Sequence, residues 1–184
     1  MEDIISRNKR ALEGRLPGDV VFFHPVAPNL FASVILAVTK QYYHHGAIVL
    51  DEKYVIEADP SNGVHISALE PYLSIYKLYL FRYTGQIDGN IIAETAKKYE
   101  GWKYDYGNVI WAGLGFILYN LTGLCCLRKL RNPFDNTSAV ESEEYIDVVF
   151  KDCNIELRPD LPPTNVSAQD LADSKLLMKI SPED

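Results

Sequence analysis

The spacing of hydrophobic and polar residues predicts a helix followed by a series of short strands. Apolar side chains recur at helical spacing over residues 3–13, and Gly14 can end that helix in a left-handed conformation. Apolar or alternating runs then follow one another with turn residues between them, which is typical of strands. These runs are residues 20–24, 43–50 and 54–58, and the segments VHISAL and YKLYLFRY.

The other periodic segments predict helices around these strands. NLFASVILAVTK is an apolar run of helix length, DGNIIAETAKKYEG predicts a helix that Gly101 stops, and another helix is predicted at about 139–152. LLMKI near the end predicts a closing strand. Because the strands mostly succeed one another and helices flank them, the sequence predicts an α+β fold with an antiparallel sheet.

Composition and charge narrow the classes of protein. The 184 residues suit one domain, taken as 1–184 with an N-terminal helix at 1–14. A net charge of −7 disfavours nucleic acid as a partner, because little basic surface is available to neutralise phosphates. The three cysteines, of which Cys125 and Cys126 are adjacent in an apolar stretch, favour structural thiols in a reducing compartment. The start lacks the basic-then-apolar order of a secretory signal, so we expect a cytoplasmic protein.

Two polar residues stand out in the predicted hairpin of residues 43–58. In an extended strand alternate side chains share a face, so His45 and Glu57 lie on the same face if the hairpin loop has three residues. A two-residue loop would put them on opposite faces, and the sequence leaves both registers open. A carboxylate beside a histidine fixes its tautomer and raises its pKa, as a general base or an imidazolium partner requires.

An ordinary structural explanation of the same residues is also open. His44 can face solvent, His45 can be a satisfied strand histidine, and Glu57 can sit at a sheet edge. We prefer His45 to His44 as the functional histidine, because the small residues that follow it leave room for a substrate. The four histidines lack ligand spacing with other histidines or cysteines, so no metal and no cofactor is predicted.

Five segments in order resemble a known family. LPGDVVFF, HGAIVL, YVIEADPSNGV, GWKYDYG and ESEEYIDVVFKDCNIEL are similar to the circularly permuted NlpC/P60 papain-like proteins, in particular the YiiX/YaeF-like branch, with lecithin:retinol acyltransferase-like enzymes as more distant relatives. The resemblance covers roughly residues 16–175. It implies a permuted papain-like fold and thiol-dependent hydrolysis or transfer at an acyl carbon, with an amide in a peptide as the expected substrate. In it, His45 corresponds to the base and Glu57 to the residue that orients it.

The chain departs from that family at the nucleophile, because the resemblance places Ser142 where the family has its cysteine. At a helix start, free N–H groups and the helix dipole would lower the pKa of a cysteine and could form an oxyanion hole. Three explanations are open: an engineered Cys-to-Ser change, a natural inactive relative that binds without cleaving, or a Ser142–His45–Glu57 triad. Ser142 can also be an ordinary serine at a helix start.

The twenty-two residues from Tyr106 to Leu127 carry no formal charge. Their length would suit a membrane span, but a crossing there would separate His45 from Ser142. We therefore expect a buried or site-covering helical element, with peripheral membrane contact through 106–127 as an alternative.

The segment GWKYDYG resembles a pocket-shaping element of the family, so Tyr104 and Asp105, with His44, are the predicted substrate-binding residues. The expected partner is a peptide or a small acyl-containing substrate. A lipid acyltransferase or lipase and a catalytically dead binding protein are the alternative functions, and the sequence gives no sign of an oligomeric state.

Overall fold

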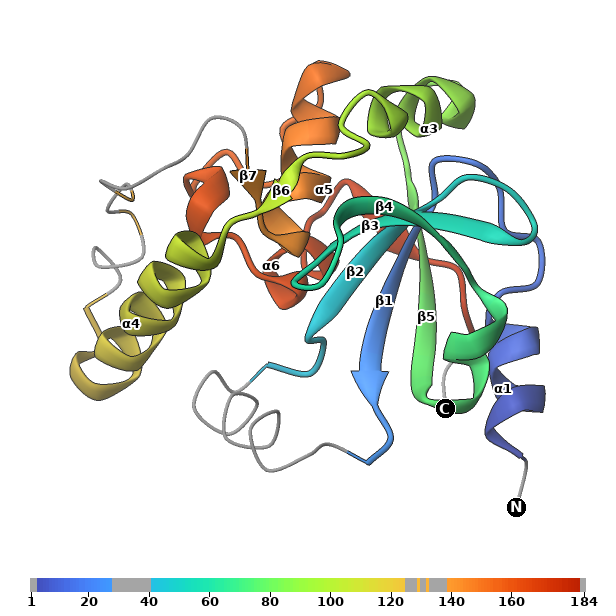
Figure 1. Cartoon of the computed structure of the whole chain (residues 1–184), viewed down its shortest axis with the longest axis horizontal. Helices are drawn as coiled ribbons and strands as arrows, with labels where there is room; N and C mark the ends of the chain where they lie inside the picture. The colour runs from blue at the N-terminus through green and yellow to red at the C-terminus, as the bar shows by residue number, and fades with distance from the viewer. Residues whose placement is uncertain (1–2, 28–40, 125–128, 130–131, 133–138, 183–184) are drawn as a thin grey trace.

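The computed structural model describes residues 3–27, 41–124, 129, 132 and 139–182, and its centre is a strongly twisted six-stranded sheet (Figure 1). The strand order is β4-β3-β2-β1-β5-β8, and every neighbouring pair in it is antiparallel. The α+β prediction is therefore confirmed. The strands are β1 (Val20–Pro25), β2 (His45–Val49), β3 (Tyr54–Asp59), β4 (Gly63–Ala68), β5 (Tyr76–Tyr83) and β8 (Leu177–Lys179).

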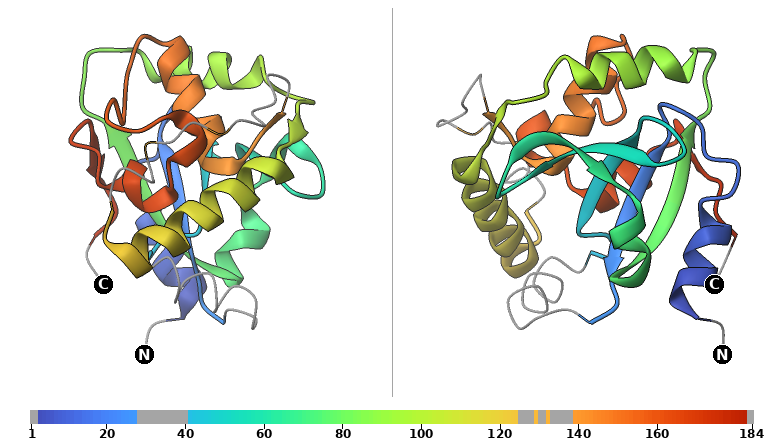
Figure 2. Two further views of the ribbon diagram at one scale, coloured as in Figure 1. Left: turned by 90° about the vertical axis from the view of Figure 1, so that its left-hand side faces the viewer. Right: turned by 45° about the vertical axis from the view of Figure 1, so that its right-hand side comes forward.

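Helices cover both faces of this sheet (Figure 2). One face carries α1 (Ile4–Ala11), which packs against β5 and the short 3-10 helix η1 (Glu70–Ser74). The other face carries α3 (Gly89–Lys97), α5 (Ser142–Asp152) and α6 (Ala168–Ala172), and α5 contacts β2 and β3. A 3-10 helix, η3 (Pro163–Asn165), packs beside α5. The predicted helix at 29–40 and the residues Cys125 and Cys126 lie outside the described residues.

Strand alternation divides the core into two apolar clusters. Val20 and Phe22 of β1 belong to the cluster under α3, α5 and α6, while Val21 and Phe23 belong to the cluster on the α1 side. All four side chains have no exposed surface. The central strands are thus apolar on both faces, which explains why their sequences read as continuous hydrophobic runs.

The β2–β3 hairpin has the three-residue loop that the sequence left open. Val49 pairs with Val55, and the Leu50 N–H donates to the Tyr54 carbonyl at 2.9 Å. The loop itself, residues 51–53, is held by the Asp51 carboxylate, which accepts from the backbone N–H groups of Lys53 and Tyr54. Odd-numbered residues of β2 therefore lie opposite odd-numbered residues of β3, which puts His45 and Glu57 on the same face of the sheet.

A small second sheet fixes the start of α5. It consists of β6 (Lys103–Tyr104) and β7 (Ala139–Val140), which run parallel, and α5 begins directly after β7. The segment before β6 is tied to β4, because Val64 donates to the Trp102 carbonyl at 2.9 Å. Gly63 permits this approach: its φ is +69°, and a Cβ there would lie 2.1 Å from the Trp102 oxygen.

Helix α4 (Tyr106–Thr122) corrects the expectation of a buried element at 106–127. It projects from the body of the protein (Figure 1), and five of its large apolar side chains are between 41% and 77% exposed. These are Ile110, Leu114, Ile117, Leu118 and Leu121. The lack of charge thus did not signal burial. Within the described residues, no helix combines the length and apolar character that a membrane span needs.

Candidate functional site

The pair predicted from the hairpin is present as a direct hydrogen bond. His45, the first residue of β2, donates from Nε2 to Oε2 of Glu57 at 2.6 Å. The other oxygen of Glu57, Oε1, accepts the hydroxyl of Tyr72 from η1, also at 2.6 Å. The Glu57 side chain is only 2% exposed and that of His45 is 20% exposed. Strand register brings the two together, and η1 holds the carboxylate in place.

The pKa values of both partners shift in the directions that an ion pair requires. Burial lowers the pKa of His45, but the hydrogen bond and charge of Glu57 outweigh burial, so the net pKa is raised. Burial alone would raise the pKa of Glu57, yet the hydrogen bond and charge of His45 together with smaller contributions from Ser67 and Tyr72 lower it to about 2. The pair therefore favours an imidazolium beside a carboxylate.

One ring nitrogen of His45 remains for chemistry. Because the Glu57 carboxylate accepts, Nε2 carries the hydrogen toward it, and Nδ1 has no hydrogen-bond partner among the described residues. The ring packs against Phe23 with centroids 5.0 Å apart. His44 is held differently: its Nδ1 donates to the Phe23 carbonyl at 2.9 Å, and burial lowers its pKa. His45, not His44, is thus the histidine with an orienting carboxylate.

Ser142 is the first residue of α5 and is 4% exposed. Its hydroxyl donates to Oε2 of Glu143 at 2.5 Å, and the described residues contain no hydrogen bond between Ser142 and His45. The helix start has a reciprocal cap, in which Glu141 accepts the Glu144 N–H and Glu144 accepts the Glu141 N–H. The cap occupies one N–H group of the first turn, while those of Ser142 and Glu143 donate to no described residue.

Ser142 and His45 belong to opposite faces of the sheet, because α5 packs over Gly46 whereas the ring of His45 packs against Phe23 on the α1 side. Ile146, one turn after Ser142, packs on β2 so closely that a Cβ on Gly46 would lie 2.7 Å from its Cδ1. Ser142 is therefore level with the residues just before Gly46. His45 alternates with Gly46 and points to the α1 side. The charge of Glu143, the residue after Ser142, acts on both His44 and His45.

Three buried carboxyl groups surround Ser142 and correct the expectation of a thiolate-stabilising helix start. Glu141, Glu143 and Glu144 are each at most 7% exposed. Burial and the nearby charge of Glu143 raise the pKa of Glu141 well above its usual range, so that carboxyl is held protonated. Oε1 of Glu143 accepts from no donor of the described chain. The charge of Glu143 opposes the helix dipole and would raise the pKa of a thiol at 142.

The predicted substrate-binding residues Tyr104 and Asp105 lie at the junction between β6 and α4, and Tyr104 pairs with Val140 just before α5. Their contacts are mainly structural. Asp105 is the N-cap of α4, since its Oδ1 accepts the Asn108 N–H at 2.9 Å, while its buried Oδ2 has no partner in the described chain. Tyr104 packs edge-on against Tyr106. Burial and then the charges of Glu141 and Glu143 raise its pKa, so its hydroxyl stays protonated beside them.

The structure also gathers a group that the sequence analysis missed. Glu57 and Asp59 are two residues apart on β3, so their side chains lie on the same face of the sheet. His65 of β4 pairs directly with Glu57. One ligand atom from each of these side chains lies within 4.8 Å of the others. Our prediction of no metal site considered only the spacing of histidines and cysteines. The signal it overlooked was two carboxylates at alternate strand positions with a histidine on the next strand.

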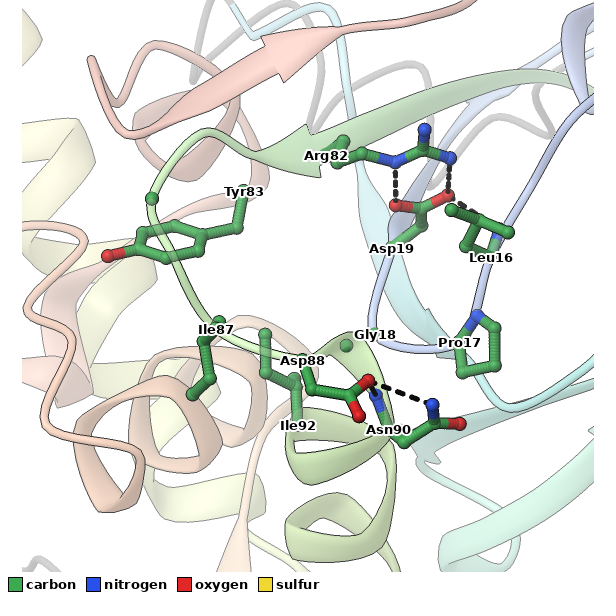
Figure 3. A pocket seen from close by; sticks show the side chains of 12 residues that line it. Leu16, Pro17, Gly18, Asp19, Arg82, Tyr83, Ile87, Asp88, Asn90 and Ile92 are labelled. Atoms are coloured by element: carbon green, nitrogen blue, oxygen red, sulfur yellow. Dashed lines mark hydrogen bonds and ion pairs between the residues drawn. The ribbon is translucent and has the colours of Figure 1, made fainter.

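Two cavities of the described structure lie away from the candidate catalytic residues. One, of about 300 Å³, lies where β1 begins and β5 ends (Figure 3). On its wall the Asp19 carboxylate forms a salt bridge with Arg82 at 2.7 Å. The other, of about 520 Å³, lies beside Leu12 and Leu69 on the α1 face. Neither cavity is lined by His45, Glu57 or Ser142, so we define the candidate site by these side chains and not by a cavity.

Comparisons with known proteins found a structure of similar fold but no similar sequence. No protein-family model matches the sequence, and no curated protein sequence matches it either. Among solved structures, the chain is similar to the crystal structure of metalloprotein yiiX from Escherichia coli O157:H7, DUF1105. The TM-score is 0.50 at 20% sequence identity, over 91% of this chain and 97% of that chain. This likeness extends along nearly the whole chain and concerns the fold.

Proposed function

We propose that the protein has a permuted papain-like site for chemistry at an acyl carbon, with peptide amides as the expected substrates. The observation that carries this proposal is the 2.6 Å hydrogen bond from His45 to Glu57, with Tyr72 holding the carboxylate. It is supported by a fold similar to yiiX and by the buried Ser142 at the start of α5, a helix that contacts the strands of His45 and Glu57.

In this site His45 is the proton carrier and residue 142 is the nucleophile. Glu57 orients the ring through Nε2, which leaves Nδ1 to exchange a proton with the nucleophile and then with the leaving group. The N–H groups of Ser142 and Glu143 are the donors available to stabilise an oxyanion. The hydroxyl of Ser142 must leave Glu143 for this arrangement to form.

A serine is a poor nucleophile in these surroundings. The raised pKa of His45 favours the imidazolium, which cannot accept a proton from a hydroxyl. An imidazolium is, however, the partner that a thiolate requires. We therefore infer that the chain with Ser142 is weakly active or inactive, and that a cysteine at this position would restore an ion-paired nucleophile.

The test is the Ser142→Cys variant treated with a peptidyl acyloxymethyl ketone, which an activated thiolate attacks at the methylene carbon to form a thioether as the carboxylate leaves. We expect one equivalent of label on residue 142, located by peptide mass spectrometry. The parent chain, which keeps Cys125, Cys126 and Cys153, is the matched control for background thiols. Label only on those three cysteines, at the same rate in both proteins, would refute the proposed position of the nucleophile.

A second candidate, chemistry on lipid acyl groups, is favoured by the exposed apolar surface of α4. Such a helix can lie at a membrane interface with its apolar side chains among the lipids. Its residues Ile110, Leu114 and Leu121 are 66%, 52% and 77% exposed. If they insert, the protein binds vesicles through α4 and meets its substrate there.

Serine at Ile110, Leu114 and Leu121 together should weaken sedimentation with phosphatidylcholine vesicles at least about tenfold, since burying each such side chain contributes about 1.5–3 kcal/mol. The control replaces three exposed apolar residues elsewhere, Ile75, Ile91 and Met178, which are 52–54% exposed. Equal binding by the two triple variants would remove α4 from lipid recognition.

A further inference from the structure

We propose that Glu57, Asp59 and His65 form a binding site for a divalent transition-metal cation, with Zn²⁺ as the best-suited ion. The three side chains come from two paired strands, β3 and β4, at the end of the hairpin that also carries His45. Binding a cation there does not depend on the acyl chemistry proposed above.

The distances fit a site that closes on a cation with a small movement. Nε2 of His65 lies 3.4 Å from Oδ2 of Asp59 and 4.0 Å from Oε1 of Glu57, and the three ligand atoms all lie within 4.8 Å of one another. Ligands at about 2.0–2.2 Å from a tetrahedral Zn²⁺ are about 3.4 Å apart. The His65–Asp59 separation already has that value. Asp59 is 26% exposed and lies at the strand end, so it can take up the remaining adjustment.

The tautomer of His65 is fixed in the form that binds metals. Its Nδ1 lies 3.0 Å from the Gly63 carbonyl, which only accepts, so Nδ1 carries the hydrogen. In this tautomer Nε2 is the acceptor nitrogen, and it faces the two carboxylates 2.9 Å from the Ser67 hydroxyl oxygen. A backbone carbonyl that holds the second nitrogen of a ligating histidine is a recurrent arrangement at metal sites. An imidazole lone pair between two carboxylates is a site that attracts a cation.

The site is compatible with the His45–Glu57 pair. His45 binds Oε2 of Glu57, whereas the ligand atom facing His65 is Oε1, which also accepts the Tyr72 hydroxyl. A carboxylate oxygen has two lone pairs, so Oε1 can bind both Tyr72 and a cation. Oδ1 of Asp59 accepts the N–H groups of Ser61 and Asn62, which fixes the direction of the carboxylate. The ligand atom is Oδ2, which accepts only a long hydrogen bond of 3.3 Å from Nδ2 of Asn62 and keeps a second lone pair for a cation.

The donor set selects the kind of ion. Mg²⁺ and Ca²⁺ prefer six or more oxygen ligands, whereas one imidazole and two carboxylates are typical of Zn²⁺ and related transition metals. Three protein ligands leave at least one coordination position for water or a small ligand, as in sites where the metal is accessible. We therefore expect Zn²⁺ to bind more tightly than Mg²⁺.

The experiment titrates ZnCl₂ into the full chain by calorimetry and repeats the titration with His65→Gln and Asp59→Asn. We expect one equivalent bound by the parent protein and at least a tenfold weaker affinity in each variant. The matched control, His24→Gln, removes a histidine whose ring stacks on Tyr42 and should leave the affinity unchanged. CoCl₂ gives a second readout, because its visible spectrum shows whether a cysteine thiolate is a ligand.

The outcomes separate a site on these strands from other binding. A cobalt spectrum with nitrogen and oxygen ligands only, lost in His65→Gln and kept in His24→Gln, would support the proposal. No binding at 100 µM metal, unchanged affinity in both variants, or a thiolate band would each overturn it. Labelling of residue 142 reports on the proposed acyl chemistry alone, so failure of one proposal is distinguishable from failure of the other.

Discussion

In the Ser142→Cys protein, the His45→Ala substitution should slow labelling of residue 142 by about 100-fold or more, because a positioned general base contributes about 10²–10⁴-fold. The reason is the charge around the thiol. The buried, charged Glu143 lies beside position 142 and favours the neutral thiol, and His45 is the cationic partner that can hold a thiolate there. Labelling rates are measured by intact-mass spectrometry under pseudo-first-order conditions.

Glu57→Gln in the same background tests whether the carboxylate acts through His45. Glutamine can still accept a hydrogen bond but carries no charge, so the imidazolium loses its ion-pair partner. We expect a loss of at least about tenfold, roughly one pKa unit or 1.4 kcal/mol of interaction with His45. In the double variant with His45→Ala, Glu57→Gln should cause no further loss. Independent, multiplicative losses would show that Glu57 does not work through the histidine.

His24→Ala is the matched control for these substitutions, since its ring stacks on Tyr42 and has no acidic partner among the described residues. It should label at the rate of the Ser142→Cys protein. Circular dichroism of each variant checks that the fold is retained. Equal labelling with and without His45 would exclude this histidine from the chemistry, whatever the fold of the protein.

Local patterns were sufficient to predict most of the sheet. The strands at 20–24, 54–58 and 76–83 can be recognised because apolar or alternating runs lie between turn residues such as Pro17-Gly18 and Asp59-Pro60. The His45–Glu57 contact followed from alternation once the loop length was known. Loop length itself depends on how Asp51 binds the turn backbone, which the sequence pattern does not specify.

The sequence predictions that were wrong or incomplete concern features that depend on tertiary packing. Helix α4 is apolar nearly throughout, so no polar face indicated which side would be exposed, and length without charge was read as burial. The burial of the three carboxyl groups beside Ser142 depends on tertiary packing that a helix-start pattern does not specify. The Glu57, Asp59 and His65 group needed the β3–β4 register, which pairs His65 with Glu57.

A buried asparagine in α1 connects the N-terminal helix to the sheet. Asn8 is fully buried, and its Nδ2 donates to the carbonyls of Leu73 at 2.8 Å and Tyr76 at 2.6 Å. Its Oδ1 accepts the Leu78 N–H at 2.9 Å. One side chain thus satisfies three backbone groups between η1 and the start of β5. That junction also positions Tyr72, which holds Glu57 for His45.

Asn8→Ala should therefore lower the free energy of unfolding by about 3 kcal/mol or more, because each buried backbone group left without a partner costs about 1–3 kcal/mol. The measurement is urea unfolding followed by circular dichroism. The matched control, Lys9→Ala, changes the next residue of the same helix, which is exposed, and should stay within about 0.5 kcal/mol of the parent. A loss below 1 kcal/mol for Asn8→Ala would show that water or another donor replaces the amide. Because η1 supports the site, we also expect this variant to label residue 142 more slowly in the Ser142→Cys background, whereas Lys9→Ala should not.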